Sequence, residues 1–135
     1  MVDAFSQWIP AHRQMSALVA QGYLGRALGG TCHFNISLFN RPSKSFPYNW
    51  FGQAGQGVNA VRNNGSHALY MLLHLFGPVV ELVADDRQIL REWMFEDGDR
   101  LNPATTDFAN IILRFENGLT LQMQISWSMA LHDGW

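Results

Sequence analysis

The sequence predicts a two-layer α+β sandwich, in which helices cover one face of an open and predominantly antiparallel sheet. Two segments place apolar residues at helical spacing, and one segment between them alternates with a period of two. Four further strand-like segments then follow one another, mostly separated by short turns. Strands joined by short turns pair antiparallel, and two helices with apolar stripes can cover one face of such a sheet. The length of 135 residues is that of a single domain.

Two helices are predicted, over residues 10–21 and 64–76, because apolar residues recur there at steps of three and four. Gly22 follows the first helix and can adopt the left-handed conformation that ends a helix. The second helix is apolar over most of its circumference, which indicates burial, and Gly77 and Pro78 end it.

The clearest predicted strand covers residues 26–39, where apolar and polar side chains alternate. Further strands are predicted at residues 79–84, 87–95, 107–115 and 119–128. The last two form a hairpin, and the apolar pattern predicts its register. A three-residue loop at 116–118 sets Phe115 opposite Leu119 and keeps the apolar side chains on one face. Such a loop needs a left-handed third residue, which Gly118 supplies.

Residues 40–59 are predicted to form a loop rich in glycine, proline and aromatic residues, among them Tyr48 and Trp50. Loops of this length are uncommon in compact domains and frequently carry binding functions. The loop is therefore predicted to form the lid or rim of a pocket.

The composition excludes several classes of partner. The chain has 9 Lys and Arg residues against 11 Asp and Glu residues, so it offers no surface that would neutralise the phosphates of a nucleic acid. The longest nearly apolar run, residues 68–80, is too short to span a bilayer, and the N-terminus lacks the pattern of a signal peptide. Cys32 is the single cysteine and cannot form an internal disulfide. These features predict a cytoplasmic protein that binds neither nucleic acid nor membrane.

His67 is the histidine with the most informative position. It is expected in the first turn of the second helix, directly after the aromatic loop, where the helix dipole favours a neutral imidazole. A neutral imidazole beside a pocket can exchange a proton near neutral pH. Spacing alone favours the simpler alternative, in which His67 and His74 are one interior and one surface histidine. None of the 5 histidines has the close spacing of a metal site, so no metal is predicted.

Residues 55–60 match the glycine pattern G-x-G-x-x-[GA] of dinucleotide-binding sites. Such a site requires an apolar strand that leads into the first glycine, so that the pyrophosphate lies at the N-terminus of the next helix. The residues before Gly55 do not form such a strand. The sequence therefore predicts no cofactor site in this chain.

Three segments of the chain carry a pattern that is more specific than any one motif. They are Gly22-Tyr23-Leu24-Gly25, the stretch from Gly55-Gln56-Gly57 through Asn63-Asn64-Gly65-Ser66-His67 to Gly77-Pro78, and the stretch from Asp107-Phe108-Ala109 to Phe115-Glu116-Asn117-Gly118. In this order they resemble the second domain of glucose–fructose oxidoreductase/inositol dehydrogenase-type enzymes, the Gfo/Idh/MocA family.

The resemblance implies a two-domain oxidoreductase. In such enzymes an N-terminal Rossmann domain binds NAD or NADP, and a C-terminal α+β domain supplies the substrate pocket and an open sheet used for homo-oligomerisation. Residues 1–135 would be a single C-terminal-type domain, without the Rossmann domain and without the final strands of the sheet. This chain alone is therefore expected to bind no cofactor and to be catalytically inactive.

The resemblance also implies site residues. His67 matches the family histidine that acts in proton transfer, and Asn63 stands where the family has an aspartate. Tyr70 stands where an aspartate is often found. A sugar, polyol or related small polar substrate is expected, because rings stack on sugars and amides orient hydroxyls. The pocket would be completed by Tyr48, Trp50 and His33.

A second hypothesis is a free-standing module without enzymatic activity, used for assembly or for binding a small ligand. The sheet would then expose apolar side chains to a partner. The residues expected to be exposed are Ile89, Trp93, Met123 and Trp127.

Overall fold

The computed structural model describes residues 5–39 and 48–129. Two α-helices and a four-stranded sheet form the main body, and short helical turns and a small hairpin complete it. The α-helices are α1 (Pro10–Ala20) and α2 (Ser66–Phe76), and the strands of the main sheet are β1 (Gly29–Asn35), β2 (Val79–Arg87), β5 (Phe108–Phe115) and β6 (Thr120–Ser126). The smaller elements are β3 (Trp93–Met94), β4 (Arg100–Leu101), the 3-10 turns η1 (Ser6–Trp8), η2 (Tyr48–Gly52) and η3 (Ala54–Gln56), and the π-helical turn η4 (Val61–Gly65).

The main sheet has the strand order β1-β6-β5-β2. Strand β5 pairs antiparallel with both β2 and β6, whereas β1 pairs parallel with β6. The α+β class is therefore confirmed, but the sheet is mixed, so the predicted antiparallel arrangement is only partly correct. The reason is that β1 is separated from β6 by a long connection that contains α2, and such a crossover permits parallel pairing.

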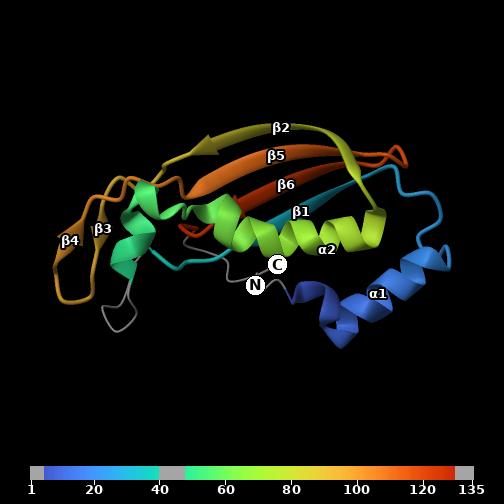
Figure 1. Ribbon diagram of the computed structural model, residues 1–135, viewed down its shortest axis with the longest axis horizontal. Helices are drawn as coiled ribbons and strands as arrows, with labels where there is room; N and C mark the ends of the chain where they lie inside the picture. Colours follow the sequence, from blue (N-terminus) through green and yellow to red (C-terminus); the bar gives the residue numbers. More distant parts are fainter. Residues whose placement is uncertain (1–4, 40–47, 130–135) are drawn as a thin grey trace.

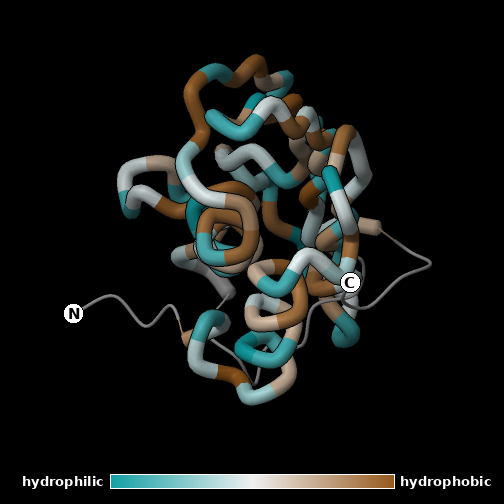
Figure 2. The backbone as a smooth tube through the Cα atoms, turned by 90° about the vertical axis from the view of Figure 1, so that its right-hand side faces the viewer, coloured by the Kyte–Doolittle hydropathy of each residue, from teal (hydrophilic) through white to brown (hydrophobic). Residues whose placement is uncertain are grey.

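Both helices lie on the same side of the sheet, as Figure 1 shows, and this agrees with the predicted two layers. In the side view of Figure 2, α2 is seen along its axis, and hydrophobic positions occur in both the helices and the strands. The core forms between the layers from alternate residues of the central strands. Its buried strand residues include Ile111, Leu113, Leu121, Met123 and Ile125.

Helix α1 begins and ends close to the predicted limits. Gly22 has a φ of +80°, and the N–H groups of Gly22 and Tyr23 donate to the carbonyls of Val19 and Leu18, both at 3.0 Å. This pair of hydrogen bonds satisfies the last carbonyls of a helix when glycine follows it. None of the side chains of α1 is buried.

Helix α2 ends at Phe76, as predicted, but it starts two residues late because the π-helical turn η4 precedes it. Only one side of α2 is buried, through Ala68, Met71 and Leu72. The prediction that α2 is buried is therefore correct for that side alone. The continuous helical segment begins at Val61, so its free N–H groups lie one turn before His67 rather than beside it.

The hairpin between β5 and β6 has the predicted register. Leu113 lies opposite Leu121, and the N–H of Phe115 donates to the carbonyl of Leu119 at 2.9 Å. The loop is therefore residues 116–118, and Gly118 has a φ of +88°. The three-residue loop predicted from the apolar pattern is confirmed.

The predicted strand at residues 87–95 is wrong. Strand β2 continues to Arg87, the chain then turns, and only Trp93 and Met94 form a short pair with β4. The turn has a physical cause in Asp107, which is only 1% exposed. Its carboxylate accepts the N–H groups of Ile89 at 2.6 Å and Leu90 at 2.8 Å, so those groups are not available to a strand partner.

An aromatic cluster fills the space between the small hairpin and the end of the main sheet. The ring of Phe39 stacks on Trp93 with centroids 4.0 Å apart and meets the edge of Trp127 at 4.9 Å. Phe51 joins the cluster from the predicted loop, through contacts with Phe39 and Trp127 at 5.6 Å each. The described part of that loop, from Tyr48, forms the turns η2 and η3 and is not irregular throughout.

The predicted exposure of Trp93, Met123 and Trp127 is wrong, because all three are fully buried. The two tryptophans pack in the aromatic cluster, and Met123 lies on the helix-covered face of β6. Of the four residues expected to be exposed, only Ile89 has an exposed side chain.

Cys32 lies on the core side of β1, and burial raises the pKa of its thiol. The folded state therefore holds the thiol proton more tightly than the unfolded state, whose thiol pKa is about 8.5. This contribution to stability is complete below the unfolded pKa and is lost as the pH rises through the folded pKa. We expect the free energy of unfolding to fall more steeply in the wild type than in Cys32→Ala as the pH rises above the unfolded thiol pKa of about 8.5, measured by urea titration. Parallel pH curves for the two proteins would contradict this.

Candidate functional site

The turn η4 sets the position of the candidate site against the sheet. A Cβ atom added at Gly65 would lie 2.6 Å from Cδ1 of Ile125 on β6, so glycine lets the helix approach the strand closely. π-helical turns inside helices frequently occur at functional sites because the extra residue changes which side chains share a face. Here the turn carries Asn63 directly before α2.

Local hydrogen bonds hold Asn63 and the start of α2 in place. The side-chain oxygen of Asn59 accepts the N–H of Arg62 at 2.8 Å, and the guanidinium of Arg62 donates to the carbonyl of Gly57 at 3.1 Å. The N–H of Asn63 donates to the carbonyl of Asn59 at 3.0 Å, and its own carbonyl accepts the hydroxyl of Ser66 at 2.8 Å. The backbone on both sides of Asn63 is therefore ordered by specific contacts.

His67 lies four residues after Asn63, and Tyr70 three residues after His67. Residues three and four apart are neighbours on a helical surface, so these side chains form one stripe. His67 is half-buried, and its ring meets the edge of Phe5 with centroids 5.9 Å apart. Tyr70 is 43% exposed. The stripe therefore combines an amide, an imidazole and a phenol on the side of α2 that the sheet does not cover.

No carboxylate accompanies this stripe from its own part of the chain. The sequence has no Asp or Glu from residue 4 to residue 80. Within that stretch, the charged residue closest to His67 along the chain is Arg62. An imidazole paired with an amide can bind a hydroxyl, and only the imidazole of the two can take its proton. The arrangement suits proton exchange by His67 with Asn63 as an orienting group.

The other predicted site residues are placed on different elements. Trp50 lies in η2, where its ring packs on Phe51 at 4.2 Å, so it borders the aromatic cluster. The backbone of Tyr48 begins η2, but its side chain lies outside the described residues. His33 pairs with Gln124 across β1 and β6, and it is exposed on the face of the sheet opposite to the buried neighbour Cys32. Asn63, His67 and Tyr70 therefore lie on one continuous helical segment, and His33 lies on the other face of the sheet.

The glycine pattern at residues 55–60 does not form a dinucleotide site. Gly55 lies in the 3-10 turn η3, and the element before it is the 3-10 turn η2 rather than a buried strand. Gly57 takes a left-handed conformation with a φ of +70° and leads into η4. Across residues 5–39 and 48–129, no group of three or more His, Cys, Asp or Glu side chains is arranged to hold a metal ion. The described helices include none with the length and apolar content needed to cross a membrane.

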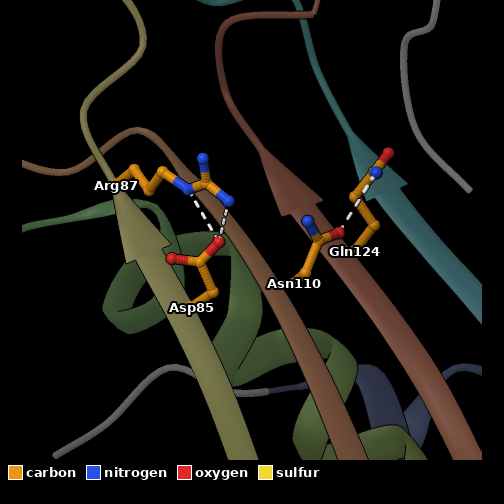
Figure 3. A network of polar contacts seen from close by, with 4 residues as sticks. All are labelled: Asp85, Arg87, Asn110 and Gln124. Carbon is orange, nitrogen blue, oxygen red and sulfur yellow. Dashed lines mark hydrogen bonds and ion pairs between the residues drawn. The ribbon is translucent and has the colours of Figure 1, made fainter.

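The helix-free face of the sheet carries a polar network that the sequence analysis did not identify. Figure 3 shows Asp85, Arg87, Asn110 and Gln124 side by side on β2, β5 and β6. The amide of Asn35 donates to Gln124 at 3.0 Å, and Gln124 donates to Asn110 at 3.3 Å. Asp85 forms an ion pair with Arg87 and raises its pKa through this hydrogen bond and through its charge. In the sequence, the only indication of this network is that polar residues occupy alternate positions in each of these strands.

An apolar pair lies beside this network on the same face. Val83 and Ile112 are opposite each other on β2 and β5, and their exposed fractions are 62% and 49%. On the other side of the pair, Arg114 donates to Glu81 at 2.5 Å. The face therefore has an apolar centre with ion pairs on both sides, which we call the open face.

Comparison with known proteins gives one family. The sequence profile of the GFO/IDH/MocA C-terminal domain matches residues 12–135. An uncharacterized oxidoreductase of Synechocystis sp. is 29% identical over 122 residues, which are 89% of this chain and 32% of that protein.

Solved structures share the fold. The NAD binding oxidoreductase from Klebsiella pneumoniae has a TM-score of 0.82 at 22% identity, over 98% of this chain and 35% of that chain. Levoglucosan dehydrogenase in complex with NADH and L-sorbose has a TM-score of 0.83 at 18% identity, over 100% of this chain and 35% of that chain. The chain thus spans about a third of the length of these relatives. It belongs to the GFO/IDH/MocA family of oxidoreductases, as a match to their C-terminal domain.

Proposed function

We propose that this chain is the substrate-binding domain of an NAD(P)-dependent oxidoreductase that acts on a sugar, polyol or related compound. The observation that carries the proposal is the stripe of Asn63, His67 and Tyr70 on the side of α2 that the sheet leaves open. One relative of the same fold is levoglucosan dehydrogenase, solved with NADH and L-sorbose, which makes a polyhydroxylated substrate a reasonable expectation.

In this proposal His67 takes the proton of the substrate hydroxyl that is oxidised. General-base catalysis of this kind contributes roughly a factor of 10²–10⁴ to a rate. Asn63 orients the hydroxyl through its amide. The ring of Tyr70 or that of Trp50 covers an apolar face of the substrate. His67 is ordered for this role by the turn η4 before it and by the contact with Phe5.

The residues of this chain do not fit the nicotinamide cofactor. The one glycine pattern that could cradle a pyrophosphate lies between short helical turns, without the strand that such a site needs. We therefore assign cofactor binding to polypeptide other than these 135 residues. The purified chain is expected to leave NADH fluorescence unchanged at micromolar concentrations.

The proposal is tested by thermal unfolding of the chain with a panel of sugars and polyols. A ligand at ten times its dissociation constant stabilises the folded state by about 1.4 kcal/mol, which raises the melting temperature by a few degrees. His67→Ala and Asn63→Ala are expected to abolish the shift. His74→Ala is the matched control, because His74 is an exposed histidine further along the same helix. An equal shift in all variants, or no shift with any compound, would contradict the proposal.

We also propose that the chain forms a homo-oligomer through the open face. The support is its composition, since an exposed apolar centre flanked by ion pairs has the anatomy of a protein interface.

Substitution in the apolar centre tests this second proposal. Ile112→Asp places a charge at the centre of the interface, and we expect it to raise the dissociation constant at least about tenfold, or about 1.4 kcal/mol. Leu73→Asp is the control, because Leu73 is similarly exposed but lies on α2. Sedimentation velocity at micromolar concentrations measures the state of each protein. A wild type that is monomeric throughout that range would refute the proposal.

A further inference from the structure

Gly65 lies within the helical segment, yet its backbone conformation does not require glycine. Its φ of −60° and ψ of −34° are ordinary values for a right-handed helix, and residues with a Cβ atom adopt them readily. Glycine is less favourable than alanine inside a helix because it loses more backbone freedom on folding. The absence of a side chain at this position is therefore explained by space rather than by conformation.

Three groups border the space beside Gly65. A Cβ atom added there would lie 2.6 Å from Cδ1 of Ile125, 3.4 Å from Cγ1 of Val61 and 3.7 Å from the carbonyl oxygen of Ala60. Ile125 and Ala60 have no exposed surface, and Gly65 is itself buried. A close-packed interior leaves the end of the Ile125 side chain little room to rotate away. An added methyl group would therefore move the helical segment away from β6.

A second contact attaches the helical segment to the sheet, at the beginning of η4. The N–H of Ala60 donates to the carbonyl of Thr106 at 3.1 Å. The hydroxyl of Thr106 in turn donates to the carboxylate of Asp86 on β2 at 2.9 Å. Ala60 precedes η4 and Gly65 is its last residue, so the two contacts hold this turn at both ends. The contact at Gly65 determines how closely the second end approaches the sheet.

The two polar residues of the candidate site lie on either side of this contact. Asn63 is two residues before Gly65, and His67 is two residues after it. A shift of the helix at Gly65 therefore displaces both side chains relative to neighbouring segments. One of these segments carries Phe5, whose ring meets the imidazole of His67 with centroids 5.9 Å apart. The depth of the helix on β6 thus sets the position of the imidazole.

We propose that Gly65 is a positioning residue for His67 and Asn63, through its close contact with Ile125. The inference rests on the proposed function, in which the two polar side chains orient and deprotonate a substrate hydroxyl. Catalytic geometry is sensitive to small displacements, and a misplacement of about 1 Å can lower a rate about 10²-fold. Loss of this contact is therefore expected to impair the site even where the helix itself remains folded.

The test moves one methyl group from the strand to the helix. Gly65→Ala introduces the close contact, and Ile125→Val removes the Cδ1 atom that causes it. The double variant Gly65→Ala/Ile125→Val therefore conserves the number of buried carbon atoms. Gly65→Ala/Ile111→Val is the matched control, because Ile111 is a core residue that is not among the three groups nearest to the added Cβ. Gly55→Ala is the control for a Cβ that meets no atom within 4 Å.

The first readout is the NMR signals of the His67 imidazole in the full chain with isotope-labelled histidine, assigned with His67→Gln. Aromatic rings shift the signals of nearby protons, so a change in the contact with Phe5 is visible in these spectra. We expect Gly65→Ala to displace the signals of His67 and Gly65→Ala/Ile125→Val to return them to the wild-type positions. The control with Ile111→Val should leave them displaced. The exposed His74 on the same helix serves as an internal reference.

The second readout is the dissociation constant of the sugar or polyol that gives the largest thermal shift with the wild type. We expect Gly65→Ala to raise this constant at least about tenfold and Gly65→Ala/Ile125→Val to restore it to within about threefold of the wild type. Gly55→Ala should bind like the wild type. Circular dichroism shows whether each variant is folded.

The two readouts separate this inference from the proposed function. Absence of binding of any compound to the wild type contradicts the proposed function, whereas the His67 signals still test the positioning role. Unchanged signals in Gly65→Ala would show that Ile125 rotates aside, and they would overturn the inference. It is also overturned if Ile125→Val does not reverse the displacement, or if Ile111→Val reverses it equally. If Gly65→Ala alone does not fold, the double variant decides, because displaced His67 signals in it would refute the positioning role.

Discussion

Replacement of Trp127 by alanine is expected to lower the free energy of unfolding by about 3–5 kcal/mol, the usual range for a fully buried aromatic side chain. Trp127 has no exposed surface, and it contacts Phe39 and Phe51 in the aromatic cluster. Its removal leaves a large void where the loop segment, the small hairpin and the end of β6 meet. Urea unfolding followed by circular dichroism measures the loss.

Two further variants separate packing from other effects. Trp8→Ala makes the same substitution at a side chain that is 70% exposed, and it is expected to change stability by about 0.5 kcal/mol or less. Trp127→Phe keeps one ring and removes an indole N–H that has no acceptor among the described residues, so its loss should be smaller than that of alanine. Similar losses for Trp127→Ala and Trp8→Ala would show that the cluster does not stabilise the fold.

Replacement of Asp107 by alanine is expected to destabilise the protein by about 2–4 kcal/mol, because a buried donor without an acceptor costs roughly 1–3 kcal/mol. The carboxylate accepts two backbone N–H groups, from Ile89 and Leu90, and the hydroxyl of Ser128 at 2.9 Å. These contacts join the turn after β2 to the segment after β6. The variant should also lose hydrogen-exchange protection at the two amides.

Asp86→Ala provides the control for Asp107. Asp86 is an exposed carboxylate that accepts one hydrogen bond, from the hydroxyl of Thr106 at 2.9 Å. Its replacement is expected to change stability by about 0.5 kcal/mol or less. Asp107→Asn retains one acceptor oxygen, so its loss should lie between the two alanine variants. Retained protection at Ile89 and Leu90 in Asp107→Ala would be incompatible with the role we assign.

Local signals predicted the helices and the hairpin well. Gly22, Gly77 and Gly118 act through their own backbone preferences, and the register at Phe115 and Leu119 follows from side-chain alternation over a few residues. The strand predicted at residues 87–95 does not form, because the backbone N–H groups of Ile89 and Leu90 donate to the carboxylate of Asp107. That residue lies 18 and 17 positions further along the chain.

The candidate site was predictable only where its residues share one helix. The family resemblance indicated Asn63 and Tyr70 together with His67, and the structure places all three on one continuous helical segment. The alternation of side chains correctly predicted that His33 points to the opposite face of the sheet from Cys32. Which of these two faces the helices cover depended on the packing of the domain. The network of Asn35, Gln124 and Asn110 joins three strands, and no local pattern indicates which strands become neighbours.

The sequence by itself therefore determined the α+β class, the C-terminal ends of the two helices and the hairpin loop. Each of these depends on backbone preference or on periodicity within a short segment. Only the tertiary structure decided that β1 runs parallel to β6, that Trp93 and Trp127 are buried, and that a cavity with a largely aliphatic lining lies between α1, α2 and β1. These features depend on contacts between residues far apart in the chain, which are chosen by the packing of the whole domain rather than by any one segment.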